Sequence, residues 1–122
     1  MAAEWRLAQG DVFWAEIEPV GTSPGYVRPF LVVQNNAFNR SRISTVVTCA
    51  LTTNLRHARD PGNVLLYPGE ANLPEQSVVN VSQIATVDLR RLRARIGVLS
   101  PDRIREVLRG IYLVLEPREV GR

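Results

Sequence analysis

Short runs of β-branched, aromatic and other apolar residues alternate with polar segments along most of the chain. Five of these runs predict strands, at residues 12–18, 30–34, 43–51, 63–67 and 77–81. A short strand or turn is predicted at 83–86 and a sixth strand at 95–99. In the first run, Phe13, Ala15 and Ile17 fall on one face. Residues 30–34 are apolar on both faces, which is typical of a central strand.

The start of a helix is predicted near the C-terminus, where Ser100 is a good N-cap, Pro101 suits the first helical position and Asp102 places an acid in the first turn. Apolar residues then recur at helical spacing and predict a core-facing stripe: Ile104, Val107, Leu108, Ile111 and Leu115. The whole pattern predicts a mainly β (α+β) fold, in which a small curled antiparallel sheet or barrel is closed by a C-terminal helix.

The length of 122 residues and the apolar content of 45% indicate one domain with a single core. No apolar run approaches the ~18 residues of a membrane span, and the N-terminal residues lack the apolar region of a signal peptide, so we expect a cytoplasmic protein. Cys49 is the only cysteine, which excludes an intramolecular disulfide and a cysteine-based zinc site. Its β-branched surroundings predict a buried thiol.

All fifteen basic residues are arginines, and the net charge is +3 with a pI near 9.7. A guanidinium group binds phosphate through two parallel hydrogen bonds or stacks on a base. The charge therefore favours a polyanionic partner, although many basic proteins bind no nucleic acid.

Arg28 and Pro29 lie just before the apolar residues 30–33, and Thr52 ends a second apolar run. A cation and a hydroxyl group at the rims of two buried strands commonly form a small polar site. The sequence has no nucleotide-binding glycine loop, nucleophile elbow, His-Glu zinc pattern or acidic cluster, so the usual metal and nucleotide sites are not expected. His57 is the only histidine, which excludes a ribonuclease mechanism with two histidines.

Several short segments then occur in one order: Gly10-Asp11-Val12-Phe13-Trp14, Val27-Arg28-Pro29, Val32-Val33-Gln34-Asn35, Leu51-Thr52-Thr53-Asn54, Ser77-Val78-Val79 and Gln83-Ile84-Ala85-Thr86-Val87-Asp88. This ordered set resembles the MazF/PemK-type toxins, the endoribonucleases of bacterial toxin–antitoxin pairs. The resemblance covers about residues 10–115 and makes the chain, 1–122, a single toxin domain.

The resemblance implies an SH3-like barrel that forms a homodimer. It implies cleavage of single-stranded RNA, often mRNA, at short sequence motifs, without a metal ion or other cofactor. The products would carry a 2′,3′-cyclic phosphate and a 5′-hydroxyl, and loss of mRNA would stop translation and growth. The partner would be a MazE-like antitoxin, whose acidic and partly disordered tail folds across the dimer groove. No membrane is involved.

By the same resemblance, Arg28 and Thr52 are the catalytic residues. Attack of a ribose 2′-OH on the adjacent phosphate builds negative charge, which a guanidinium and a hydroxyl group stabilise. Arg28 could also act as a general acid, although its high pKa as a residue type favours charge stabilisation. The expected RNA-binding residues are Ser23, Tyr26, Asn35, Thr53, Asn54, Arg56, His57, Ser77 and Gln83.

The sequence departs from its relatives in two places. The loop of the family often carries Ser-Glu-Gln-Gly where this chain has Thr22-Ser23-Pro24-Gly25. Some members also carry an acid at the position of Ser82 and an arginine at that of Asn80 or Ala85, all of which are neutral here. The general base is therefore unassigned. The alternative is a non-catalytic toxin of the same fold that binds RNA or poisons DNA gyrase. Trp14 either stacks on a base or, as we favour, packs within the fold or at a dimer interface. The run Arg90, Arg91 and Arg93 is interpreted as a solvated turn.

Overall fold

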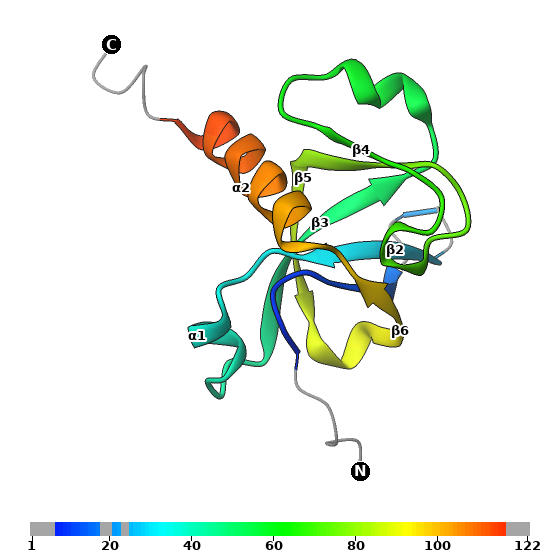
Figure 1. The fold of residues 1–122 in the computed structure, drawn as a ribbon. Helices are drawn as coiled ribbons and strands as arrows, with labels where there is room; N and C mark the ends of the chain where they lie inside the picture. Colours follow the sequence, from blue (N-terminus) through cyan, green and yellow to red (C-terminus); the bar gives the residue numbers. More distant parts are fainter. Residues whose placement is uncertain (1–6, 18–20, 23–24, 117–122) are drawn as a thin grey trace.

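The structure is a computed structural model that describes residues 7–17, 21–22 and 25–116 of the chain (Figure 1). Its strands are β1 (Asp11–Ile17), β2 (Tyr26–Val32), β3 (Thr45–Thr52), β4 (Val64–Leu66), β5 (Ser77–Asp88) and β6 (Leu92–Val98). Its helices are α1 (Asn36–Asn39) and α2 (Pro101–Leu115), with the 3-10 helices η1 (Leu55–Arg59), η2 (Glu70–Asn72) and η3 (Leu89–Arg91). Each predicted strand therefore has a counterpart.

The strands form one curled antiparallel sheet in the order β4-β5-β3-β2-β1-β6. A bulge in β5 bends the sheet, because Cys49 of β3 pairs with Ile84 while the next residue, Ala50, pairs with Asn80. The prediction of two separate elements at 77–81 and 83–86 is thus wrong. They are one strand that continues through the bulge.

The two edges of the curled sheet are bridged by η2. The Asn72 side-chain amide donates to the Ile96 carbonyl oxygen of β6 at 3.1 Å. A Cβ atom on Gly97 would lie only 2.3 Å from the Ala71 carbonyl oxygen, so this approach requires glycine in β6. The result is a half-barrel, which confirms the predicted curled sheet.

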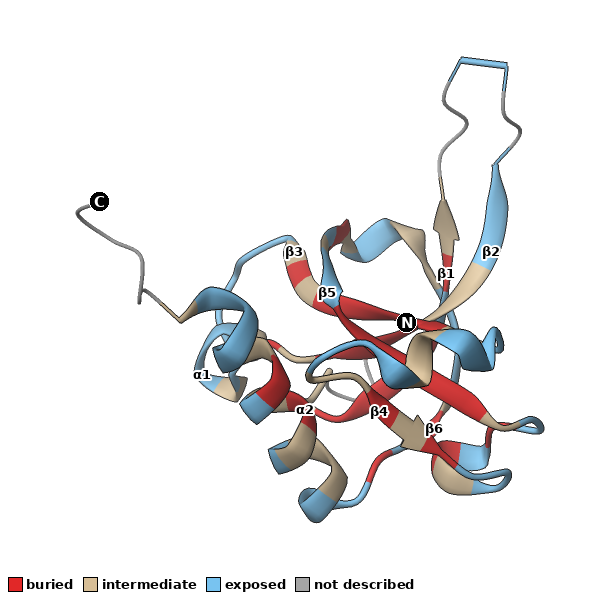
Figure 2. Cartoon of the chain, turned by 90° about the horizontal axis from the view of Figure 1, so that it is seen from above, coloured by how far each residue is buried: buried red, intermediate tan, exposed pale blue. Residues whose placement is uncertain are grey.

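Both faces of the central strands are buried (Figure 2). Leu31 and Cys49 belong to one apolar cluster, whereas Phe30, Val32 and Ala50 belong to a second cluster on the opposite face. This confirms that residues 30–32 form part of a central strand. It also confirms the buried thiol, since Cys49 is fully buried.

Helix α2 begins as predicted, with the Ser100 hydroxyl oxygen accepting from the Arg103 backbone N–H at 3.3 Å. Val107 is buried, and Ile104 and Ile111 pack against the first cluster. The stripe is wrong at its end, because Leu115 is 64% exposed. The last turn of α2 projects beyond the sheet, away from the strands of the described part of the chain (Figure 1).

Strand β2 begins at Tyr26, earlier than predicted, because β1 continues to pair with it through Ile17. Arg28 and Pro29 therefore lie within the strand. The ladder with β3 starts only at Phe30, so Pro29, which has no N–H to donate, lies just outside it. None of the helices in the described part of the chain combines the length and apolar character needed to cross a membrane.

Candidate active site

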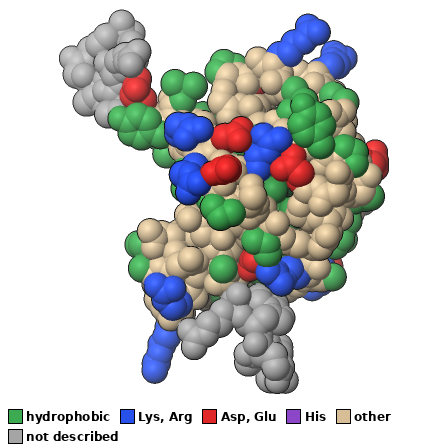
Figure 3. Space-filling view, in the orientation of Figure 1, with side chains coloured by type: hydrophobic (Ala, Val, Ile, Leu, Met, Phe, Trp, Pro, Cys, Tyr) green, Lys and Arg blue, Asp and Glu red, His purple; other side chains and the backbone are tan. Residues whose placement is uncertain are grey.

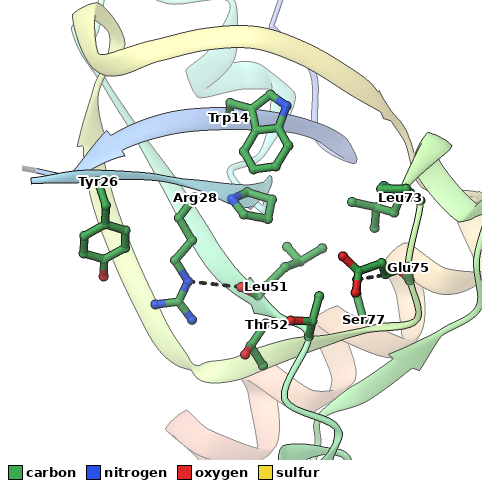
Figure 4. A pocket seen from close by; sticks show the side chains of 11 residues that line it. Trp14, Tyr26, Arg28, Leu51, Thr52, Leu73, Glu75 and Ser77 are labelled. Carbon is green, nitrogen blue, oxygen red and sulfur yellow. Dashed lines mark hydrogen bonds between the residues drawn. The ribbon is translucent and has the colours of Figure 1, made fainter.

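A hollow of about 290 Å³ opens where β2 separates from β3, beside the start of β5 (Figure 4). Its polar side chains come from three strands and two connecting segments, and its apolar wall includes Trp14 of β1. The lining residues are Trp14, Tyr26, Arg28, Pro29, Leu51, Thr52, Thr53, Leu73, Pro74, Glu75 and Ser77. It thus contains both residues that the sequence singled out as catalytic.

Strand register explains why Arg28 and Thr52 meet. The ladder between β2 and β3 ends at the pair Phe30 and Ala50. Two residues further along each antiparallel strand, the same register places Arg28 opposite Thr52. The pair therefore lies just beyond the ladder, where the strands separate and leave room between them. At this position the surrounding sheet fixes both backbones, because Arg28 pairs with Ala15 of β1 and Thr52 pairs with Val78 of β5.

The guanidinium group of Arg28 is held from one side. Its Nε donates to the Leu51 carbonyl oxygen at 3.1 Å, and its Nη2 lies 3.5 Å from the Gln83 side-chain oxygen. Within the described residues Arg28 forms no ion pair. Donors of this cation therefore remain for an anion in the hollow.

The hydroxyl group of Thr52 also has a defined role in the local structure. Its oxygen accepts from the Asn54 backbone N–H at 3.1 Å, while the Asn54 side-chain oxygen accepts from the Arg56 backbone N–H at 3.2 Å. These two bonds fix the turn from β3 into η1. Because the Thr52 oxygen acts here as an acceptor, its own proton stays available as a donor.

Most other charged groups of the fold neutralise one another. Basic and acidic side chains alternate over α2 on the face in Figure 3, where Arg103 forms ion pairs with Glu70 and Glu106. Hydrogen bonds from Arg103 hold the pKa of Glu70 below its ordinary value. Ion pairs also join Arg90 with Asp88, Arg91 and Arg93 with Glu16, and Arg95 with Asp11. Arg28 differs from all of these in having no acidic partner among the described residues.

The run Arg90, Arg91 and Arg93 lies in η3 and the start of β6. Arg90 is 90% exposed, in line with a solvated turn, whereas Arg91 and Arg93 are tied to Glu16 across the sheet. Arg91 and Arg93 thus link η3 and the start of β6 to β1, while Arg90 pairs with Asp88 at the surface.

The structure brings together several of the expected RNA-binding residues. Tyr26, Thr53 and Ser77 line the hollow, Gln83 contacts Arg28, and Asn54 holds Thr52. These residues come together because β2 separates from β3 at this point, while β3 and β5 remain paired.

Other expected residues lie outside the hollow. Arg56 and His57 lie on η1, and His57 Nδ1 is 3.0 Å from a carboxylate oxygen of Asp60. Asn35 follows the opposite end of β2, where its side chain caps α1 by accepting from the Ala37 N–H at 2.8 Å. Ser23 lies outside the described residues.

The sequence pattern did not reveal Glu75, which lines the hollow from the segment between η2 and β5. Neither strand periodicity nor motif spacing relates this segment to Arg28. Only the closure of the sheet by η2 brings it there. Within residues 7–17, 21–22 and 25–116, no three His, Cys, Asp or Glu side chains lie together in a way that would hold a metal ion.

Comparisons with known proteins agree with this architecture. Residues 8–115 match the family model of the PemK-like, MazF-like toxins of type II toxin–antitoxin systems. Endoribonuclease MazF6 of Mycobacterium tuberculosis (strain ATCC 25618 / H37Rv) and endoribonuclease MazF2 of Mycobacterium bovis (strain ATCC BAA-935 / AF2122/97) are each 37% identical to the chain over 111 residues, which is 90% of this chain and 97% of each relative.

Solved structures give the same result for the fold. A mycobacterial endoribonuclease in complex with its cognate antitoxin superposes with a TM-score of 0.72 at 27% identity, over 89% of this chain and 94% of that one. MazF from a MazE–MazF complex of Deinococcus radiodurans, at 22% identity and a TM-score of 0.74 over 92% of this chain and 97% of that one, shares the fold. The family match covers nearly the whole chain and includes every residue that lines the hollow. The chain therefore belongs to the PemK-like, MazF-like toxins of type II toxin–antitoxin systems.

Proposed function

We propose that this chain is a sequence-specific endoribonuclease that cleaves single-stranded RNA, chiefly mRNA, and thereby arrests growth by stopping translation. The observation that carries the proposal is the pairing of Arg28 with Thr52 in one hollow, with guanidinium donors free of any acidic partner among the described residues. Membership of the toxin family and the names of the relatives support the reaction class.

The reaction needs no group beyond the RNA, the protein and water. The 2′-oxygen of one ribose attacks the adjacent phosphorus, and the bond from phosphorus to the 5′-oxygen of the next nucleotide breaks. Arg28 stabilises the charge that builds on the non-bridging oxygens, and Thr52 donates a further hydrogen bond. The products are a 2′,3′-cyclic phosphate and a 5′-hydroxyl. No metal ion or other cofactor takes part in this scheme.

The walls of the hollow would hold the nucleotides on either side of the cut. Tyr26 is half exposed and Trp14 is 38% exposed, so both rings offer a face on which a base can stack. Ser77, Thr53, Asn54 and Gln83 would provide polar contacts near the phosphate. Arg56 and His57 on η1 would bind RNA further along the strand, and roles for Ser23 and Asn35 stay predictions.

The proposal includes two protein partners. One is a cognate MazE-like antitoxin with an acidic tail; the mycobacterial relative was solved with its own antitoxin. The other is a second copy of the chain in a homodimer. We treat residues 1–122 as one toxin domain that acts in the cytoplasm.

Cleavage of a long single-stranded RNA in excess EDTA tests the proposal, with cut sites mapped by primer extension. Wild-type protein should give discrete cuts that share a short motif, and Arg28→Ala and Thr52→Ala proteins should lose them. Arg42→Ala is the matched control, because Arg42 is exposed and lies outside the hollow. An Arg28→Ala protein that cuts as fast as wild type would refute the site. Intact RNA together with inhibited gyrase supercoiling would instead establish the non-catalytic toxin.

A further inference from the structure

Glu75 provides the only carboxylate group among the described residues that line the hollow. It lies on the segment between η2 and β5, across from Arg28 and Thr52. Figure 4 shows its side chain turned toward the space that these two residues border. A carboxylate in this position is of interest because cleavage through the 2′-oxygen requires a proton acceptor.

The position of Glu75 is fixed by its backbone. The hydroxyl group of Ser77, which is 4% exposed, donates to the Glu75 carbonyl oxygen at 3.0 Å. Leu73, two residues earlier, is also 4% exposed and anchors the segment in the core. Pro74 between them restricts the backbone further. The segment therefore presents the Glu75 side chain to the hollow from a rigid base.

Within the described part of the chain, the Glu75 carboxylate forms no ion pair and no side-chain hydrogen bond. In contrast, Asp11, Glu16, Glu70 and Asp88 each have an arginine partner. A carboxylate near a bound phosphate is unfavourable, by about 1 kcal/mol for two unit charges 4 Å apart in water. Glu75 is exposed and lines the hollow, so its carboxylate is accessible to the 2′-OH of a bound ribose and free to accept a proton from it.

We propose that Glu75 is the general base of the cleavage reaction, an inference that rests on the function proposed above. The Glu75 carboxylate takes the proton of the ribose 2′-OH as the 2′-oxygen forms its bond to phosphorus. The bond between phosphorus and the 5′-oxygen breaks, and the 5′-oxygen takes a proton from water. The hydroxide that remains then removes the proton from Glu75, which restores the carboxylate.

The test compares wild type with Glu75→Gln, which keeps the shape of the side chain but cannot accept the proton. Single-turnover cleavage of a short RNA is measured from pH 5 to 9, with circular dichroism at each pH to confirm folding. Glu75→Gln should cut about 100- to 10,000-fold more slowly than wild type at neutral pH. Its affinity for a non-cleavable 2′-O-methyl oligonucleotide should stay unchanged or rise. Glu75→Asp should recover part of the rate.

The pH profile separates proton transfer from a merely structural role. The wild-type rate should fall on the acid side with a slope near one in log units, and this limb should be absent in Glu75→Gln. The other side chains of the hollow with ionisable groups are Arg28 and Tyr26 of β2, and neither is a carboxyl or an imidazole group. They therefore cannot replace the acid limb.

Three results would overturn the inference. The first is a Glu75→Gln protein that keeps the wild-type rate and acid limb while Arg28→Ala is inactive, which leaves the proposed function intact. The second is a shift of the cleavage motif without loss of the acid limb, which would place Glu75 on a base edge. The third is a wild-type protein that cuts no RNA, which removes the proposed function and this inference together.

Discussion

Replacing Arg28 by lysine separates the shape of the cation from its charge. The Arg28 Nε is used for the Leu51 carbonyl oxygen at 3.1 Å, so the two terminal nitrogens carry the phosphate contacts. Lysine keeps one positive charge but loses the parallel pair of donors and the anchor on Leu51. Loss of one transition-state donor costs about 2.7–4 kcal/mol, which corresponds to roughly 100- to 1,000-fold in the cleavage rate. Loss of the anchor should cost about 1 kcal/mol of unfolding free energy.

The assay is single-turnover cleavage of the wild-type target motif, with urea unfolding run in parallel. Because lysine retains the charge, the affinity for a non-cleavable oligonucleotide should fall far less than the rate. Arg42→Lys, an exposed position outside the hollow, should match wild type in all three measurements. An Arg28→Lys protein that cuts at the wild-type rate would refute the argument that two parallel guanidinium donors hold the phosphate.

Three further predictions concern the scaffold. A Cβ atom on Gly110 would lie 2.2 Å from the Gly62 carbonyl oxygen. The clash outweighs the gain in helix propensity, so Gly110→Ala should lower the unfolding free energy by about 1–2 kcal/mol. Urea unfolding measures this, with Tyr112→Ala as the exposed control. The pKa of Glu70 lies below its ordinary value of 4.5 because Arg103 donates hydrogen bonds to the carboxylate. The stability that this pair contributes is therefore complete above pH 4.5 and is lost as the pH falls through the folded-state pKa of Glu70. The difference in unfolding free energy between wild type and Glu70→Gln should close in acid. Burial raises the pKa of the Cys49 thiol to about 11, so iodoacetamide at pH 8 should label it only after urea unfolding; rapid labelling of folded protein would contradict the buried position.

Strand positions were predictable from sequence because the apolar runs coincide with strands that are buried on one or both faces. Their ends were less predictable. Tyr26 and Val27 are exposed, so no hydrophobic signal marks them as part of β2, and only pairing with β1 makes them strand. Likewise, the exposed residues Ser82 and Gln83 interrupt the apolar pattern of β5, where the bulge keeps the strand continuous.

One wall of the hollow is formed by strands β2 and β3, and the other by the segment that carries Glu75. The sequence predicts the residues of the first wall but not those of the second. Thr52 ends β3, and Arg28 lies in β2 just beyond the β2–β3 ladder. Buried neighbours fix the register of both strands, so an error of one residue would turn either side chain away from its partner. Glu75 lies on a segment that reaches the hollow only because η2 closes the sheet against Gly97. No local pattern encodes that contact. The wall formed by β2 and β3 can therefore keep the phosphate chemistry constant. The segment between η2 and β5 is free to carry a different proton acceptor, or a different contact to the bases, without disturbing the pairing of β2 with β3.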